Sequence, residues 1–236
     1  ARTVFASHVC VSQYLLYGPT GHDEVVRLAR ELAASAEQLG RAHAVAFAST
    51  LEGEAHLLQG DLDAARACLE SAVATYRALG AETGLAHALQ RLAEVALHEG
   101  DRAEAERLVS TALPLARWSP LSAHLVQRLH GTLIAAAPDP DAAARAADDA
   151  LVTVDDPETC MFCHVIVAVP ATIAYAAAGR LDDARAQLDV AQRFAARWPG
   201  PAWPAAATEA AAVVARAEGR EDDAVALFGR AASGFD

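Results

Sequence analysis

The sequence predicts an all-α protein, a right-handed α-solenoid of about six helix hairpins, and three observations lead to this fold class. First, a short turn signal recurs about every forty residues. The signals are Gly21-His22, Gly60-Asp61, Gly100-Asp101, Pro138-Asp139, Gly179-Arg180 and Gly219-Arg220. Second, alanine- and leucine-rich stretches, each long enough for one helix, flank every signal. Third, the apolar residues in these stretches recur with a helical period. Such hairpins bury their apolar faces by stacking on their neighbours.

The first two repeats establish the plan. The expected repeats, within a single domain 1–236, are residues 3–39, 42–79, 82–118, 121–155, 160–198 and 201–235. In the first repeat, residues 18–21 are expected to form the turn, and Asp23 and Glu24 favour the positive end of the helix that follows. In the second repeat, the helix after the turn carries a continuous apolar stripe: Ala64, Ala65, Leu69, Ala72, Val73 and Tyr76.

The later repeats carry prolines and tryptophans at informative positions. We expect Pro114 to kink the second helix of the third repeat, and Pro170 to bend the first helix of the fifth. The fourth repeat is the most degenerate, because its turn is the segment 138–140 and its second helix is nearly all alanine on the packing face. Trp118 and Trp198 end similar segments, and both are predicted to pack between repeats.

Charge and composition exclude several classes of partner. With 31 acidic against 19 basic residues, the net charge of −12 predicts neither direct nucleic acid binding nor attraction to an anionic membrane. No signal-like start and no long uncharged apolar run occurs, so we expect a cytoplasmic protein. All the basic residues are arginine and asparagine is also missing, which indicates a GC-rich genome such as that of an actinobacterium.

The sequence indicates that the chain is not an enzyme. Without lysine it has no P-loop lysine and no Schiff base, and it lacks the metalloprotease, serine hydrolase and phosphate-loop motifs. Pairs of aspartates invite a metal-binding interpretation. However, Asp182-Asp183 and Asp222-Asp223 hold the same place in two repeats, the first turn of a helix, where carboxylates stabilise the helix N-terminus.

Small residues at matching positions of several repeats resemble those of the tetratricopeptide family in a lengthened form. They are Gly53, Ala65 and Ala72; Ala93, Ala105 and Ala112; Tyr175, Ala184 and Ala191; and Ala212, Ala224 and Ala231. The segment from Cys160 to Trp203 is most similar to the helical-repeat sensor region of the large ATP-binding LuxR-type transcriptional regulators of actinobacteria. This resemblance implies an ATPase before the repeats and a DNA-binding helix-turn-helix after them.

The first and last residues favour a fragment of a longer chain. The sequence begins with Ala1, and it ends at Asp236 directly after a second-helix pattern, without the polar helix that normally caps a solenoid. We therefore expect an effector- or protein-binding module of a multidomain regulator. One alternative is a structural scaffold that self-assembles through its uncapped ends, and another is a thiol- or metal-responsive sensor.

First helices of such repeats line a concave groove, where a protein, a peptide or a small-molecule effector could bind. The residues predicted to face it are Phe47, Thr50, Glu54, His87, Gln90, Glu94, Arg128, Val169 and Glu209. The competing interpretation is a solvated inner face without a ligand. A homodimer is also left open.

Cys160, Cys163 and His164 form the one local motif with several metal-capable groups. Two cysteines three residues apart can share a helix face and form a redox pair or half of a zinc site, whose other ligands His124 and His130 could supply. The Cys-x-x-Cys-His string also matches a c-type haem attachment motif, but nothing in the sequence indicates export. The plain alternative is two packed thiols and no cofactor.

Overall fold

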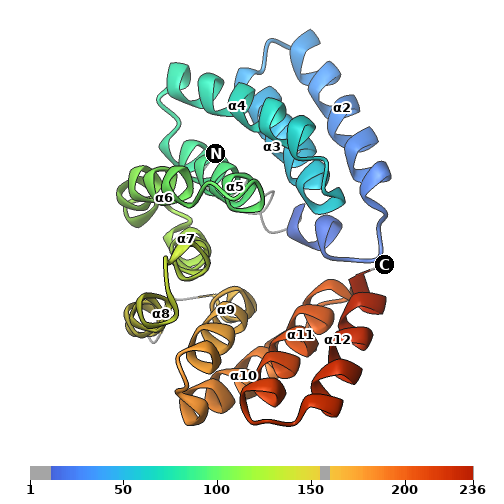
Figure 1. Cartoon of the computed structure of the whole chain (residues 1–236). Coiled ribbons are helices and arrows are strands. Elements are labelled where there is room, and N and C mark those ends of the chain that lie inside the picture. The colour runs from blue at the N-terminus through green and yellow to red at the C-terminus, as the bar shows by residue number, and fades with distance from the viewer. Residues whose placement is uncertain (1–11, 155–159, 236) are drawn as a thin grey trace. The chain divides into compact units, whose positions relative to one another are not determined.

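The computed structural model describes residues 12–154 and 160–235 of the chain. Throughout these residues the regular elements are helices, which confirms the all-α class (Figure 1). Consecutive helices pack against one another, as expected for a helical-repeat fold. The chain divides into two compact units. The N-terminal unit comprises Ala1–Leu16 and Thr20–Leu129, and the C-terminal unit comprises Tyr17–Pro19 and His130–Asp236.

The N-terminal unit contains the hairpins of the second and third repeats. Its helices are α2 (His22–Gln38), α3 (Ala42–Gln59), α4 (Leu62–Leu79), α5 (Glu82–His98) and α6 (Arg102–Arg117). Helices α3 and α4 form one hairpin and α5 and α6 the next, while α3 and α5 also contact each other directly. The first helices of neighbouring repeats therefore lie side by side, as a stacked repeat requires.

The C-terminal unit follows the same plan. Helix α7 (Ser122–Ala136) begins in the N-terminal unit and ends in this one. The elements that follow are α8 (Pro140–Val154), the short 3₁₀ helix η1 (Met161–Cys163), α9 (His164–Ala177), α10 (Leu181–Ala195), α11 (Ala202–Ala217) and α12 (Glu221–Phe235). Helices α9 and α10 pair, as do α11 and α12, and α9 contacts α11.

The recurring turn signal has a physical basis in both of its residues. Gly60 and Gly100 adopt left-handed conformations, with φ of 78° and 85°, which end the preceding helix. The aspartate that follows caps the next helix. The Asp61 carboxylate accepts a hydrogen bond from the Ala64 N–H at 3.1 Å, and Asp101 caps α6 in the same way. The dipeptide thus stops one helix and starts another.

The turns between repeats in the N-terminal unit use glycine too, which the sequence analysis missed. Gly40 and Gly80 each have a φ of 62° and follow the second helix of a hairpin. Together with Gly60 and Gly100 they place a left-handed glycine every twenty residues. The underlying period in this part of the chain is therefore a single helix and its turn, and the forty-residue repeat contains two of them.

The prolines occupy two kinds of position. Pro140 is the first residue of α8, a position whose backbone N–H has no partner within the helix, so proline loses no hydrogen bond there. The Asp139 carboxylate caps the helix by accepting a hydrogen bond from the Ala142 N–H at 2.7 Å. Pro114 and Pro170 lie inside α6 and α9, and both helices continue past them. Each proline lacks a backbone N–H, so it removes one hydrogen bond from its helix.

The two tryptophans of the matching segments have opposite environments. Trp198 is buried, and its ring packs against those of Tyr17, at 5.8 Å between centroids, and Trp203, at 6.2 Å. The packing predicted for it is confirmed. The same prediction for Trp118 is wrong, because that side chain is 88% exposed. Five residues after Trp118 the chain has Ala123, where the corresponding position after Trp198 is Trp203, so the aromatic partner is missing.

Glycines inside helices mark places where helices approach closely. A Cβ at Gly53 would lie 2.7 Å from the Leu69 side chain, and one at Gly131 would lie 2.5 Å from the backbone oxygen of Ile166. These distances are shorter than van der Waals contact, so no larger residue fits without movement of a neighbour.

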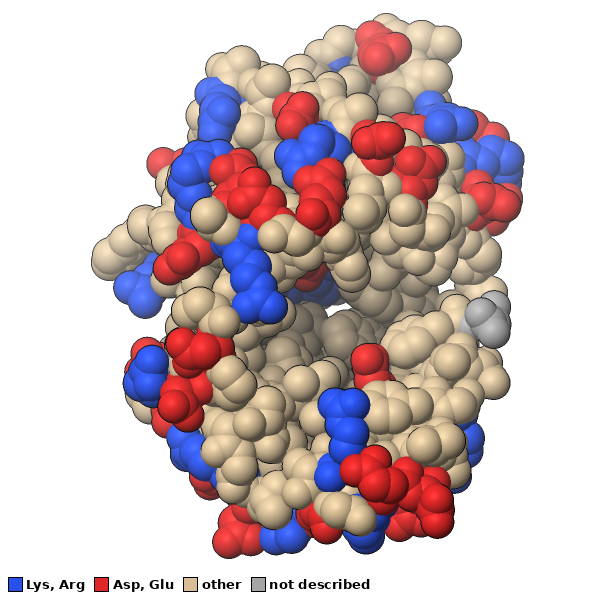
Figure 2. Space-filling view, in the orientation of Figure 1, with Lys and Arg blue, Asp and Glu red and all other residues tan. Residues whose placement is uncertain are grey.

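Charged side chains are mixed over the surface. On the face drawn in Figure 2, arginines lie beside acidic side chains in each unit, without a large patch of either sign. Several of these neighbours are ion pairs, such as Arg66 with Glu99 and Arg185 with Glu218. Among the described helices, none is long and apolar enough to cross a membrane.

The close approach at Gly131 can be tested by adding one methyl group. We expect Gly131→Ala to lower the free energy of unfolding by about 2 kcal/mol, because the obstructing atom is a backbone oxygen and cannot rotate away. Chemical denaturation followed by circular dichroism measures this change.

The matched control is Gly229→Ala on the exposed face of α12, where a Cβ would meet no atom within 4 Å. The free energy of unfolding of this variant should rise by about 0.5 kcal/mol, since alanine favours the helix and restricts the unfolded chain. Equal stability of the two variants would contradict the packing described for α7 and α9.

Candidate functional site

Most of the residues predicted to line a groove lie in the N-terminal unit. They are Phe47, Thr50 and Glu54 on α3, His87, Gln90 and Glu94 on α5, and Arg128 on α7. The other two belong to the C-terminal unit, where Val169 is buried in α9 and Glu209 is exposed on α11. The structure therefore divides the predicted set between its two units.

Helical spacing brings polar side chains to one face of α5. This face begins with His87, and the residues three, four and seven positions after it are Gln90, Arg91 and Glu94. Such spacing places the four side chains on neighbouring turns of the helix. The first three are buried, and Glu94 is half-buried. On α3, Glu54 is 1% exposed. Contact between α3 and α5 brings Glu54 against this face of α5.

Glu54 is the centre of a buried ionic cluster, defined here as Glu54, Arg91 and Arg128. The Arg91 guanidinium donates to Glu54 Oε1 from Nε at 2.7 Å, and its Nη2 lies 2.6 Å from the same oxygen. His87 Nε2 lies 3.3 Å from it as well. One carboxylate oxygen thus receives several partners, as a buried charge requires.

The environment keeps Glu54 ionised. Burial acts to raise its pKa, but the positive charge of Arg91, followed by His87 and Arg128, outweighs burial and holds the pKa of Glu54 well below the usual range for a carboxyl group. The carboxylate is therefore a permanent acceptor and a permanent negative charge at neutral pH.

The cluster extends along α5 and toward the beginning of the chain. Arg91 also pairs with Glu94 at 2.6 Å, and Gln90 Nε2 donates to Glu94 Oε1 at 2.6 Å. Arg128 donates to the side-chain oxygen of Gln13. Neither Arg91 nor Gln13 was among the predicted groove residues. Arg91 could have been found from its spacing to His87, whereas Gln13 is far away in the sequence.

The side chains of α3, α5 and α7 offer both donors and acceptors of hydrogen bonds. Arg91 and Arg128 supply donors that face a shared interior, while Glu54 and Glu94 supply acceptors. These side chains can therefore donate hydrogen bonds to a neutral polar group and accept hydrogen bonds from it.

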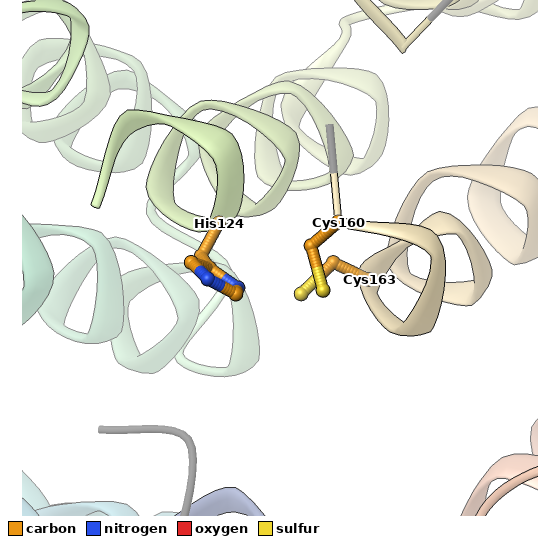
Figure 3. A group of neighbouring side chains, drawn as sticks. All are labelled: His124, Cys160 and Cys163. Atoms are coloured by element: carbon orange, nitrogen blue, oxygen red, sulfur yellow. The ribbon is translucent and has the colours of Figure 1, made fainter. Parts of the chain in front are cut away.

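The two cysteines of the C-terminal unit are neighbours. Their Sγ atoms lie within 4.8 Å of each other, and Figure 3 shows both sulfurs pointing to the same side. Cys163 is buried and Cys160 half-buried, and neither is in a disulfide. They belong to a 3₁₀ turn, in which the Cys163 N–H donates to the Cys160 carbonyl at 2.9 Å, and α9 begins after it. Their proximity therefore arises from the turn before α9.

His164 and His130, two of the histidines expected to help these thiols, contact other groups. The His164 ring packs against Phe194 with 4.9 Å between centroids. His130 Nε2 lies 3.5 Å from the Thr153 hydroxyl. His124, also labelled in Figure 3, is a residue of α7 within the N-terminal unit. The pair of thiols by itself supplies two of the four ligands that a structural zinc ion needs.

Comparison with known proteins identifies the fold alone. No family model matches the sequence, and no curated protein matches it. Among solved structures, the chain is similar to the crystal structure of BtubC (BKLC) from P. vanneervenii, with a TM-score of 0.63 and 17% sequence identity. The alignment covers 91% of each chain. At this identity the likeness concerns the helical architecture and not the activity.

The ionised state of Glu54 predicts sensitivity to acid. A carboxyl whose pKa is lower in the folded than in the unfolded protein stabilises the fold when the pH is above its pKa in the unfolded protein, about 4.3. This contribution is lost progressively as the pH falls below that pKa. We expect the melting temperature to fall between about pH 5 and pH 3. Glu54→Gln should flatten this dependence and, at pH 7, cost about 3 kcal/mol, because it removes the buried carboxylate that pairs with Arg91.

The control for this measurement is Glu24→Gln. Glu24 pairs with Arg27 on the surface, and its pKa is also lowered by the hydrogen bond from Arg27, but both side chains are about half exposed to solvent. We expect little change in stability at pH 7. An unchanged acid profile in Glu54→Gln would show that Glu54 is not the group that titrates.

The thiol pair predicts a reversible response to oxidation. We expect mild oxidation to remove two titratable thiols from the native protein, because the two sulfurs need to move little to form a bond. The loss should disappear in Cys163→Ser and persist in the control variant Cys68→Ser. Zinc analysis of the reduced protein belongs to the same experiment. If the thiols are unreactive and bind no metal in either the reduced or the oxidised protein, their role is packing alone.

Proposed function

We propose that this chain is the effector- or protein-binding helical-repeat module of a multidomain transcriptional regulator. Its binding site is the inner face of α3 and α5 in the N-terminal unit. The observation that carries the proposal is the buried ionic cluster of Glu54, Arg91 and Arg128, which lies among the first helices of the repeats. A protein, a peptide or a small effector bound there would alter the activity of the domains next to the module.

The energetic cost of the cluster supports this role. Each ion taken out of water costs several kcal/mol, and well-packed apolar residues often stabilise a fold as well as a buried ion pair does. The rest of the core of the described units consists mainly of alanine, leucine and valine. A helical repeat therefore has no need of these charges for its stability, and local departures from such a pattern are typical of functional sites.

The class of regulator rests on the resemblance of residues 160–203 to the sensor region of the large ATP-binding LuxR-type proteins of actinobacteria. The likeness to BtubC supports the helical architecture alone. A net charge of −12 supports a role in which this chain binds an effector or a protein in the cytoplasm and leaves DNA contact to another domain.

The test replaces Glu54 and its buried partner Arg91 together in the full-length protein. We expect the double variant Glu54→Gln with Arg91→Met to change regulated transcription about five-fold or more, and to leave affinity for operator DNA within about two-fold, because specific DNA affinity comes from base and phosphate contacts elsewhere. Reporter assays and mobility-shift assays give the two values.

The matched control is Glu24→Gln with Arg27→Met, an exposed ion pair on α2. It should leave both readouts unchanged. Regulation that is insensitive to the cluster would overturn the proposal, and so would binding of operator DNA by the present chain alone.

A structural scaffold remains the second candidate, because α12 exposes apolar side chains. Val225 is 70% exposed and Phe235 is 54% exposed, and such residues can bury themselves between copies. Sedimentation over a range of concentrations separates the two functions. A sensor module stays monomeric or dimeric, whereas a scaffold associates further as its concentration rises.

A further inference from the structure

The side chain of Gln13 lies inside the buried ionic cluster. Gln13 belongs to a helical stretch of five residues, 12–16, at the beginning of the described chain. Its side chain is 6% exposed, and those of Ser12 and Leu16 are 2% exposed. A polar side chain that is almost completely buried in a segment distant in sequence requires partners that recognise it.

Both ends of the Gln13 carboxamide have charged partners. Its Nε2 donates to Glu54 Oε1 at 3.3 Å, and its Oε1 accepts from Arg91 Nη2 at 3.4 Å and from Arg128 Nη2. The two arginines therefore face the oxygen and the carboxylate faces the nitrogen. Hydrogen bonds to charged groups are stronger than those between neutral groups.

This arrangement discriminates between side chains. A glutamate in place of Gln13 would put a second carboxylate beside Glu54, which is ionised and buried. A lysine or arginine there would face Arg91 and Arg128. A carboxylate cannot donate to Glu54, and a cation cannot accept from the two arginines, whereas a carboxamide does both, so the cluster selects a carboxamide.

The segment that presents Gln13 is bound much as a separate peptide would be. Gln13 and Leu16 are three positions apart, so a helix directs both to the same side, and both are buried. Tyr14, on another side, is 44% exposed. The contacts of Gln13 with Glu54 and Arg128 attach this segment to the rest of the N-terminal unit.

We propose that the ionic cluster is a carboxamide-binding site for helical peptides and that the chain fills it with its own Gln13. The ligand taken in its place is a helical segment of a partner protein with a glutamine and, three residues later, a leucine. This inference rests on the proposed function and deepens it, because it names the chemistry of the partner. Residues 12–16 are then a competitor built into the chain.

The test measures binding of a fluorescent synthetic peptide to the whole 236-residue chain. The peptide has the sequence of residues 11–18. Binding to the Gln13→Ala protein should be at least about ten-fold tighter than binding to the wild-type protein, since apparent affinity rises with the fraction of open sites. Peptides that carry alanine or glutamate in place of the glutamine should bind the Gln13→Ala protein at least about ten-fold more weakly.

A measurement on the wild-type protein keeps the test independent of whether the variant folds. The side-chain NH₂ resonances of Gln13, assigned by NMR, should exchange slowly with water in the free protein and move to solvent-exposed values on addition of the glutamine peptide. The alanine peptide should leave them in place.

Two results would overturn the inference. One is equal affinity of the Gln13→Ala protein for the glutamine, alanine and glutamate peptides, and the other is the absence of any change at Gln13 in the wild-type protein. If either occurs while Glu54→Gln with Arg91→Met still alters regulation, the inference fails and the proposed function stands. If the peptide binds as expected while Glu54→Gln with Arg91→Met leaves regulated transcription unchanged, the proposed function fails and the peptide site stands.

Discussion

Close packing of helices through very small side chains is the constraint on which both units depend. Alanines such as Ala65, Ala105 and Ala184 are completely buried, and a Cβ at Gly131 would collide with the backbone of α9. Small side chains bring neighbouring helix backbones close together, so many weak dispersion contacts accumulate over a long interface. They also leave little tolerance for larger residues at these positions. Helix length must then match from hairpin to hairpin, and in the N-terminal unit the regularly spaced glycine turns provide that match.

The buried ionic cluster stands out against this background. A core of alanine and leucine gains stability from apolar burial alone, whereas Glu54 and Arg91 must recover the cost of leaving water through contacts with each other. The cluster also holds the segment of residues 12–16, so the cohesion of the beginning of the chain and the chemistry of the candidate site share the same three charges. Any change to one of these charges affects both.

Local signals made much of the fold predictable. The left-handed glycine and the capping aspartate act within a few residues of each other, so Gly60-Asp61 and Gly100-Asp101 identify helix ends without knowledge of the tertiary structure. The candidate site was predictable in part. Alignment of the repeats identified Glu54, His87 and Gln90 on their first helices. The contact of Glu54 with Gln13 spans 41 residues, and no local pattern predicts it.

The sequence by itself determined the helices, their ends and their repetition, because helix propensity, capping and periodicity are properties of neighbouring residues. Tertiary structure alone decided the environment of each exception. Trp118 and Trp198 sit in matching segments, yet one is exposed and the other lies against Tyr17, since burial depends on what the rest of the chain brings to the site. It likewise decided that Gln13 meets Arg128, a pairing set by the stacking of helices.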